Sequence, residues 1–549
     1  MFLPLQWRTL ALFSALLSSY GSHLSIASAQ QTSTTNSSQT PTLRANTRMV
    51  VVDVVATDSK GQPTPDLKAE DFTVFEDGKP QTISAFNYER TGSNVTVSTQ
   101  VQLPPSVVTN APKFQSNARD IILFDSINGE FSEQAYAREQ LLKFLNGTEL
   151  TRPVVVFALE SRLKLLHDFT TDNKSLGQAV AKYRPPAQQM SVETTESRAS
   201  AFATLGDYHT SEVNIETTLN QLNALAKVLA GYPGRKNLIW LSESFPLTLF
   251  PEAMNLPMNG QSTSMGKFAV DGESAQRLAI SGDLARIPNK SYAALVKKVS
   301  DVLMAAQVAV YPVDSATVTK NDHLASQHTM DNMAERTGGR SFKNSNDLVT
   351  ELHSGIEDGA TYYTLSYYPD NKNWDGQFRV IQIKGSHADL KLRYREGYYA
   401  LDPEKVNKEA ANATGENFSR SLQLDSPEAT GVIFQAQILP PAGNNKKVLV
   451  TLHVDPQTIT FDHKTGDEEY AKLSCSVWAY SNSKGKPEMF NGTVTANLKP
   501  KDYQQMMQQH FLPCNQELDL KPGNYTLRLG ILDRTSNKFG TATYSLTVQ

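Results

Sequence analysis

The chain has 549 residues, of which 39% are hydrophobic and 20% are charged, and its formal net charge is −4. This composition is that of ordinary globular protein, and the chain is too long for one hydrophobic core, so we expect roughly two to four domains. The small negative charge gives no electrostatic reason to bind nucleic acid or an anionic membrane surface.

The first 29 residues are predicted to be a signal peptide. Arg8 precedes an apolar run that ends at Leu17, and a small-x-small sequence ends at Ala29, which is the pattern of a signal-peptidase site. The run is too short to span a bilayer, so we expect a secreted or periplasmic chain with no integral membrane segment after signal removal. Residues 30–45, rich in Ser, Thr and Gln, are predicted to form a disordered linker.

Residues 46–90 are predicted to form the N-terminal strands of a β-sandwich. A β-branched run occupies residues 48–57, and two further runs at 72–75 and 81–86 are joined through an Asp-Gly turn, the strongest short hairpin signal. Because so few strands are not stable alone, they need partners from elsewhere in the chain. A linker rich in Ser, Thr and Pro is predicted at residues 91–115.

Residues 116–345 are predicted to form an α/β domain with long insertions. Short apolar runs without polar alternation read as central strands covered on both faces, and helical patterns separate them. This alternation predicts a Rossmann-like, doubly wound parallel sheet, with residues 163–169 as an antiparallel edge. The expected central strands lie at 121–124, 153–159, 237–241 and 308–313, and the expected insertions lie at about 186–212 and 247–288.

After residue 345 the hydrophobic period changes to two. Residues 346–402 are predicted to complete the sandwich begun by residues 46–90, so that the α/β domain is inserted into it. A linker at 403–424 then leads to a C-terminal all-β domain of immunoglobulin-like size at 425–549.

Both cysteines of the chain, Cys475 and Cys514, fall in the C-terminal domain. An exported location would permit a disulfide between them, and we predict one; the alternative is two separate buried thiols.

Asp125 is the candidate at the centre of the functional site. It ends the first central strand, and an aspartate at the carboxyl end of a parallel strand points into the crevice where open α/β sheets bind ligands. Ser126, Asn128 and Ser132 follow in a polar loop, and Glu243 follows another central strand. These residues are the predicted partner or metal crevice.

Several segments of the chain form a recognisable set: residues 51–58 and 71–81, the strand end at 124–128, the glycine pair at 338–339 and the Tyr-Tyr-Ala sequence at 398–400. Together they resemble the exported bacterial VWFA-related domain proteins, which are similar to von Willebrand factor A domains. The resemblance covers roughly residues 46–402. It implies a Rossmann-like α/β fold and a role in adhesion or protein–protein binding.

The resemblance also implies where a metal ion would bind. In A domains an Asp-x-Ser-x-Ser loop, a threonine and a second aspartate hold Mg²⁺ or a similar ion, and an acidic residue of the partner completes the coordination. Asp125 matches the first aspartate and Glu243 the second, but Ile127 and Gly129 occupy the two serine positions. The threonine cannot be placed within residues 204–218, so the metal-ion-dependent adhesion site is expected to be degenerate.

Two interpretations of this site stay open from the sequence. Asp125, Asn128 and Glu243, with Ser126 or Ser132, would form an altered oxygen cage for Mg²⁺ or another divalent cation. Alternatively, Asp125 caps the following helix and Asn128 hydrogen-bonds the loop, with no ion.

No catalytic constellation stands out in the sequence, which lacks a nucleophile elbow and a His-Glu-x-x-His motif. We therefore predict a non-enzymatic exported protein that binds unknown protein partners through the crevice at Asp125. The alternatives are an extracytoplasmic hydrolase whose site assembles from separated residues such as Asp125, Glu243 and Asp314 with a histidine, and a structural envelope component.

Overall fold

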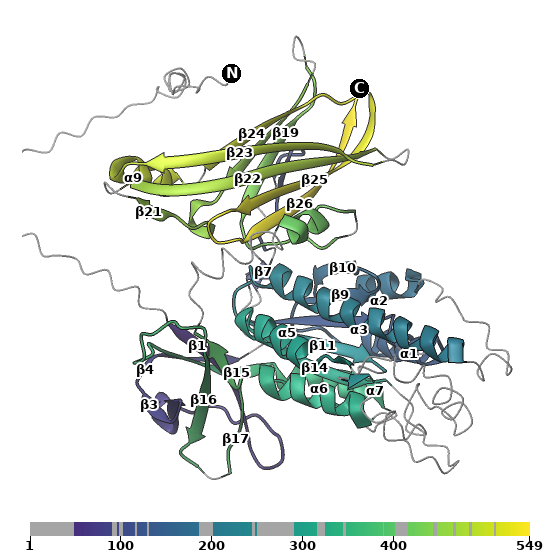
Figure 1. The fold of residues 1–549 in the computed structure, drawn as a ribbon, viewed down its shortest axis with the longest axis vertical. Coiled ribbons are helices and arrows are strands. Elements are labelled where there is room, and N and C mark those ends of the chain that lie inside the picture. The colour runs from purple at the N-terminus through teal and green to yellow at the C-terminus, as the bar shows by residue number, and fades with distance from the viewer. Residues whose placement is uncertain are drawn as a thin grey trace, which may run out of the picture. The chain divides into compact units, whose positions relative to one another are not determined.

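The computed structural model of the chain is drawn in Figure 1. The predicted signal peptide and the linker after it lie outside the described residues, as does most of each expected insertion. The structure describes residues 49–90, 96–97, 103–112, 114–115, 118–128, 131–185, 201–243, 248–249, 290–315, 324–343, 347–387, 389–400, 415–424, 426–442, 447–464, 468–481, 486–509 and 512–549.

A five-stranded sheet forms the centre of the α/β part, in the order β10-β9-β8-β11-β14. Four of the strands, β9, β8, β11 and β14, are parallel, and β10 pairs antiparallel with β9 at one edge, as the sequence predicted. Every residue of the four parallel strands is buried, which explains their continuous apolar runs. The strands are β8 (Ala118–Asp125), β9 (Val154–Leu159), β10 (Leu163–Thr170), β11 (Arg235–Ser242) and β14 (Val308–Asp314).

Helices cover both faces of this sheet (Figure 1), because alternate side chains of each strand point to opposite faces. Ile121 and Leu123 of β8 pack in one hydrophobic cluster with α3 and α5, whereas Ile122 and Phe124 pack in another with α1, α2 and α7. The sheet is therefore doubly wound. The helices are α1 (Phe131–Gly147), α2 (Asn173–Lys182), α3 (Ala201–Leu229), α5 (Ala293–Ala305), α6 (Leu324–Thr337) and α7 (Leu348–Asp358).

Two helices differ from the expectations. α3 begins at Ala201, inside the segment expected as an insertion, and its later turns bury Ile215 and Leu219 against the sheet. α6 was not predicted at all. Its sequence is mostly polar, and among its described side chains the buried apolar ones are Met330, Met333 and Ala334, so its hydrophobic signal is weak.

The N-terminal strands pair with strands that lie some 300 residues later in the chain. β1 (Val50–Thr57) runs antiparallel to β15 (Thr361–Tyr367), with Val52 opposite Leu365, and β2 (Phe72–Glu76) runs antiparallel to β16 (Phe378–Gly385). The two four-stranded sheets have the orders β17-β1-β15-β4 and β18-β16-β2-β3. Their remaining strands are β3 (Lys79–Gln81), β4 (Ile83–Arg90), β17 (Lys391–Arg393) and β18 (Gly397–Tyr399), and a 3-10 turn lies at Ala69–Asp71.

The C-terminal part is built from antiparallel strands in two sheets, β24-β20-β19-β6 and β21-β22-β25-β26, with β23 paired to β22. The segment 91–115 was expected to be a linker only, but its residues Val107–Thr109 form β6 and pair with β19. The elements are β19 (Phe434–Leu439), β20 (Val448–Val454), β21 (Asp462–Lys464), β22 (Glu468–Ser481), β23 (Glu488–Leu498), α9 (Pro500–Gln509), β24 (Leu512–Leu518), β25 (Gly523–Asp533) and β26 (Phe539–Val548), with a 3-10 turn at Pro456–Thr458.

The predicted disulfide is present between Cys475 of β22 and Cys514 of β24. It joins the two sheets of the C-terminal part, and both cysteines are buried in the core between them. Two short strand pairs lie elsewhere: β5 (Thr96–Val97) with β7 (Phe114–Gln115), and β12 (Thr248–Leu249) with β13 (Lys290–Ser291). Among the helices of the described segments, none has the length and apolar character needed to cross a membrane.

Candidate functional site

Asp125 is the last residue of β8, at the carboxyl end of the parallel strands. From β8 the chain continues to β9 on one side, and it returns to β11 on the other side, so β8 and β11 flank the topological switch point of the sheet. Such points are where open α/β sheets bind ligands. Ser242 and Asp314 end the next two strands and lie opposite each other in register, so three polar residues mark this edge.

The carboxylate of Asp125 is held by five hydrogen bonds from the described residues. Oδ1 accepts the backbone N–H groups of Ile127 (3.1 Å) and Asn128 (3.0 Å). Oδ2 accepts the side-chain amide of Asn128 (2.9 Å), the indole N–H of Trp240 (3.2 Å) and the hydroxyl of Ser242 (2.7 Å). The aspartate thus closes its own loop and ties that loop to β11.

Two residues of α3 fix the loop from the other side. The amide nitrogen of Asn128 also donates to Thr218 Oγ1 at 2.7 Å, and Asn214 Nδ2 donates to the carbonyl of Ile127 at 3.1 Å. Thr218 is completely buried, and Asn128 is 7% exposed. The loop after β8 is therefore anchored to both β11 and α3.

Ser126 belongs to a separate hydrogen-bond chain. Its hydroxyl lies 2.8 Å from the hydroxyl of Tyr183, which in turn donates to Glu160 Oε1 at 2.9 Å. Because Tyr183 has one proton and donates it to Glu160, Ser126 is the donor to Tyr183. Burial, and then the nearby Glu160, raise the pKa of Tyr183 well above its ordinary value.

Burial also raises the pKa of the Asp125 carboxyl. The hydrogen bonds from Asn128, Ser242 and the backbone N–H groups oppose this effect, because they stabilise the ionised form. Because both oxygens of this carboxylate already accept hydrogen bonds, they offer little free coordination to a cation.

Of the predicted site residues, the structure brings Asp125, Ser126 and Asn128 together in one buried loop. Glu243 is buried directly after Ser242, but among the described contacts the hydrogen bond to Asp125 comes from Ser242. Ser132 is exposed in the first turn of α1, and none of the donors to Asp125 is its hydroxyl.

The sequence analysis missed the residues that hold this loop, among them Asn214, Thr218, Trp240 and Ser242. Trp240 and Ser242 lie in a strand that was predicted, so their place at the same edge as Asp125 could have been inferred from parallel pairing. The sequence did not indicate that Thr218 contacts the loop, because α3 is long and nothing distinguished one of its threonines from the others.

A divalent cation does not fit at Asp125 as the residues are arranged. Two of the groups on Oδ2 are an amide nitrogen and an indole nitrogen, which donate protons and cannot serve as ligands for a hard cation. The family's two serine positions are Ile127 and Gly129, which supply no hydroxyl. Within the described residues, no group of three or more His, Cys, Asp or Glu side chains is arranged to hold a metal ion.

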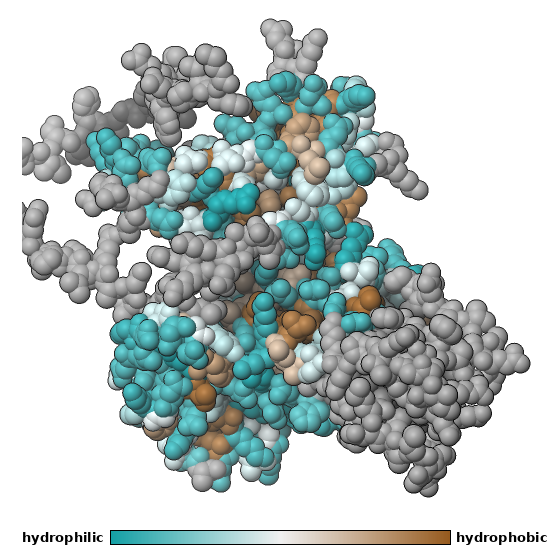
Figure 2. All heavy atoms as spheres, viewed as in Figure 1, coloured by the Kyte–Doolittle hydropathy of each residue, from teal (hydrophilic) through white to brown (hydrophobic). Residues whose placement is uncertain are grey.

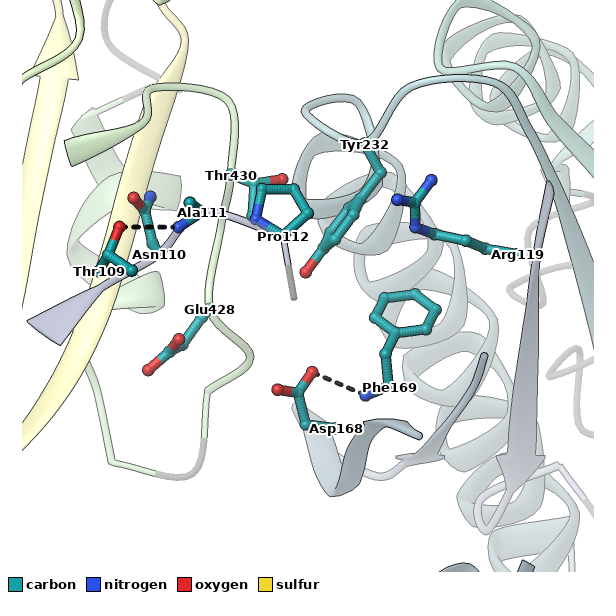
Figure 3. A pocket seen from close by; sticks show the side chains of 10 residues that line it. All are labelled: Thr109, Asn110, Ala111, Pro112, Arg119, Asp168, Phe169, Tyr232, Glu428 and Thr430. Atoms are coloured by element: carbon teal, nitrogen blue, oxygen red, sulfur yellow. Dashed lines mark hydrogen bonds between the residues drawn. The ribbon is translucent and has the colours of Figure 1, made fainter. Parts of the chain in front are cut away.

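A hollow lined by ten residues lies at the opposite ends of the same strands (Figure 3). Arg119 is the second residue of β8, and its guanidinium lies 5.1 Å from the ring of Tyr232. The ring of Phe169 packs on Tyr232 with centroids 5.0 Å apart, and burial raises the pKa of Tyr232. This hollow contains none of the predicted site residues, so it is distinct from the crevice at Asp125.

Comparisons with known proteins give matches only among solved structures. No protein-family model matches the chain. No curated protein sequence matches it either.

The similar solved structures include an aerotolerance-related membrane protein from Bacteroides fragilis, at 10% identity over 44% of this chain and 98% of that one, with a TM-score of 0.24. Three N-terminal domains of a type V pili tip protein from Porphyromonas gingivalis match at 9% identity over 83% of this chain and 100% of that one, with a TM-score of 0.25. A von Willebrand factor type A structure from Catenulispora acidiphila matches at 10% identity over 65% and 83%, with a TM-score of 0.18.

These neighbours include one structure that is itself described as von Willebrand factor type A. With TM-scores this low, the description of the fold rests on the strand order, the parallel pairing and the helices on both faces of the sheet.

Proposed function

We propose that this chain is an exported, non-enzymatic protein that binds a protein partner, in adhesion or assembly, at the carboxyl ends of β8, β11 and β14. Two observations carry the proposal: the hydrogen-bonded loop after Asp125, here called the floor, lies at the switch point of the sheet, and α1 and α3 carry exposed apolar side chains, here called the rim. The partner would be a protein segment that presents an apolar side chain to this rim.

The rim contains two large apolar side chains that are exposed to solvent. Phe131 is the first residue of α1, shortly after the Asp125 loop, and it is 62% exposed. Val213 is 61% exposed and precedes Asn214, whose amide holds the carbonyl of Ile127. Many hydrophilic residues lie on the described surface in Figure 2. We take exposed apolar side chains on the elements next to the Asp125 loop as candidate contacts with a partner. Burying such a side chain stabilises a complex by about 1.5–3 kcal/mol.

The floor of the crevice argues for binding over catalysis. Asp125 accepts hydrogen bonds at both oxygens, and Asp314 accepts one from Gln327 at 2.9 Å. A general base needs an accessible lone pair directed at its substrate. The hydrolase alternative, built on Asp125, Glu243 and Asp314, is therefore less well supported than a contact surface.

The domain organisation that goes with this function is the one expected from the sequence. We propose the α/β domain at 116–345 as the binding unit, inserted into the sandwich formed by 46–90 and 346–402. The all-β domain at 425–549, proposed to be immunoglobulin-like, would act as a spacer or a further contact surface. Limited proteolysis followed by mass spectrometry would test these boundaries.

Affinity capture tests the binding proposal. Purified mature protein would be used as bait against the envelope fraction of its source, in parallel with Phe131→Asp/Val213→Asp and with Met489→Asp, a control on β23 that is 58% exposed in the wild type. We expect the double variant to bind a specific partner about tenfold or more weakly, since a few buried residues carry most of the binding energy of an interface and two charges would be buried in their place. Equal capture by the wild type and the double variant would contradict the proposal.

Two further measurements test export of the protein and the absence of catalytic activity. Mass spectrometry of the protein recovered outside the cytoplasm should find a mature N-terminus at Gln30. A broad hydrolase screen should find no turnover that depends on Asp125. Turnover lost in Asp125→Asn would favour the enzyme alternative.

A further inference from the structure

The side-chain amide of Asn128 bridges two acceptors that come from different elements. Its nitrogen lies 2.9 Å from Asp125 Oδ2 on β8 and 2.7 Å from Thr218 Oγ1 on α3. All three side chains are buried. The orientation of the amide is fixed by its neighbours, because a flipped amide would place its carbonyl oxygen against the carboxylate of Asp125.

The same two acceptor types, the loop aspartate and a threonine, are the ones that the A-type metal site brings to its ion. Here a nitrogen that carries two protons lies between them. Each proton is directed to one acceptor, so the amide does what a small cation would otherwise do: it joins a carboxylate to a hydroxyl oxygen across the crevice.

The other hydrogen-bond donors to Asp125 make it unfavourable for a cation to displace the Asn128 amide. Oδ1 already accepts two backbone N–H groups, and Oδ2 also accepts Trp240 Nε1 and Ser242 Oγ. A cation at Oδ2 would have to push aside an amide and an indole in a buried site, leaving their N–H groups without acceptors. Unsatisfied buried donors are strongly unfavourable.

We propose that the Asn128 amide replaces the divalent cation in this crevice, so that the loop after β8 holds its binding conformation without any metal ion. The proposal concerns Asp125, Asn128 and Thr218 themselves and does not depend on the identity of a partner. It predicts that the wild-type protein neither binds Mg²⁺, Mn²⁺ or Ca²⁺ at Asp125 nor responds to a chelator.

The sharpest test reverses the polarity of the bridging group. Asn128→Asp keeps the shape of the side chain but places a second carboxylate against Asp125 and Thr218, which is a set of hard oxygen ligands. We expect Asn128→Asp to have a lower Tm than the wild type in the presence of chelator, and to regain several degrees when millimolar Mg²⁺, Mn²⁺ or Ca²⁺ is added. The wild type should show no shift with either additive.

Two further variants separate this effect from general damage to the loop. Asn128→Ala removes both hydrogen bonds and should lower the Tm with no rescue by cations. Asn214→Asp alters the neighbouring amide, which holds a single carbonyl and no carboxylate, and should gain no cation dependence.

Calorimetric titration of the wild type and of Asp125→Ala with Mn²⁺ completes the experiment and does not require the Asn128 variants to fold. Binding to the wild type that disappears in Asp125→Ala would overturn the proposal. An Asn128→Asp variant that folds but is not stabilised by any of the three cations would also overturn it, because the amide would then not lie where an ion can bind.

Discussion

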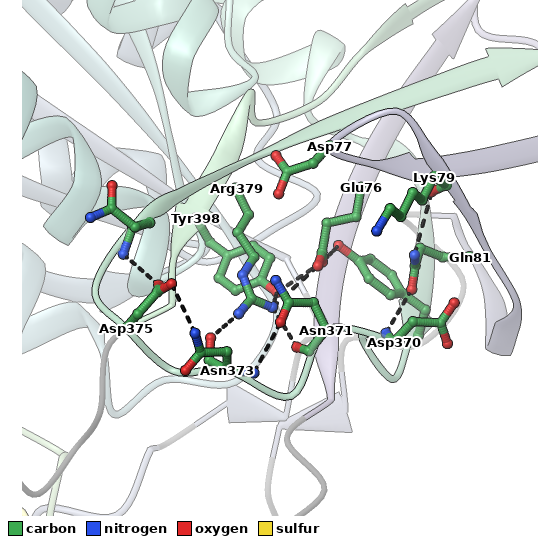
Figure 4. A network of polar contacts seen from close by, with 12 residues as sticks. Glu76, Asp77, Lys79, Gln81, Asp370, Asn371, Asn373, Asp375, Arg379 and Tyr398 are labelled. Carbon is green, nitrogen blue, oxygen red and sulfur yellow. Dashed lines mark hydrogen bonds and ion pairs between the residues drawn. The ribbon is translucent and has the colours of Figure 1, made fainter.

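Glu76 on β2 and Arg379 on β16, which lie 303 positions apart in the chain, form a buried ion pair. The nitrogen–oxygen distance is 3.2 Å, and each side chain is only 2% exposed. Figure 4 shows the network around the pair. The hydroxyls of Tyr367 and Tyr398 each donate to Glu76 Oε2 at 2.8 Å, and Arg379 donates to the backbone carbonyls of Asn371 and Asn373. The network around the pair thus connects β2, β15, β16 and β18, and Arg379 fixes the loop between β15 and β16.

We predict that Arg379→Met destabilises the protein by about 3–5 kcal/mol, because it leaves the Glu76 carboxylate buried without its counterion. Glu76→Gln/Arg379→Met should cost less than Arg379→Met alone, since the remaining amide carries no charge. Urea unfolding would measure the change in the free energy of unfolding, and hydrogen exchange of the backbone amides in β15 and β16 would show whether these strands are destabilised.

An exposed ion pair provides the control. Arg420 lies 3.8 Å from Glu416, and both side chains are more than half exposed, so Arg420→Met should change stability by less than about 0.5 kcal/mol. If Arg379→Met were as mild as Arg420→Met, the buried pair would have no structural role.

Lys236, at the start of β11, gives the protein a pH dependence above neutrality. Its side chain is buried, and its ammonium donates to the carbonyl of Tyr232 at 2.7 Å. Burial, and then the charge of Arg119, lower its pKa to about 7, while Asp53 acts in the opposite direction. Between pH 7 and pH 10 the unfolded chain therefore binds a proton that the folded chain does not. The free energy of unfolding should rise with pH in this window, by at most about 1.4 kcal/mol per pH unit.

Urea unfolding at pH 7 and pH 9 measures this effect. Relative to Lys236→Met, which cannot titrate, we expect the wild type to gain about 2 kcal/mol between these two values. Lys143→Met, at an exposed helix position, should keep the wild-type slope. Parallel pH profiles for the wild type and Lys236→Met would show that Lys236 titrates normally.

The disulfide between Cys475 and Cys514 should be a major source of stability for the C-terminal sheets. It closes a loop with a sequence separation of 39, for which restriction of the unfolded chain amounts to about 4 kcal/mol. We expect Cys475→Ala/Cys514→Ala to lower the unfolding midpoint of this part. A reductant should lower the midpoint of the wild type and leave that of the double variant unchanged, and an equal response of both would contradict the prediction.

The architecture was predictable where a single segment carries the signal. The apolar run at the centre of β8 has no polar alternation because both faces of the strand are covered, and Ile121 and Ile122 do pack in different clusters. The hairpin after β2 was likewise readable, because Asp77 and Gly78 both adopt positive φ angles, of 48° and 78°.

The rest depends on contacts between distant residues, which no local pattern encodes. The segment that forms β6 resembles a linker in sequence, because only three of its residues form the edge strand that pairs with β19 and so short a strand leaves no clear pattern. In the site, Asp125 was found from its position at a strand end. Ser242, which donates to Asp125, and Thr218, which accepts from Asn128, lie 90 or more residues further along the chain. The sequence could therefore indicate the loss of the usual metal ligands without indicating that Asn128 fills the gap.

Gly338 and Gly339, which were noted in the sequence as part of the family resemblance, allow α6 to end directly against β14. Gly338 has a φ of +77°, and a Cβ on Gly339 would lie 1.9 Å from the carbonyl oxygen of Val310. We predict that Gly339→Ala costs about 3 kcal/mol or more, because β14 cannot move away without disturbing the sheet. Gly147→Ala is the matched control, since a Cβ there meets no atom within 4 Å. Urea unfolding of both variants would measure the decrease in the free energy of unfolding. If Gly339→Ala decreased it no more than Gly147→Ala does, the end of α6 and β14 could move apart without cost, and the prediction would be wrong.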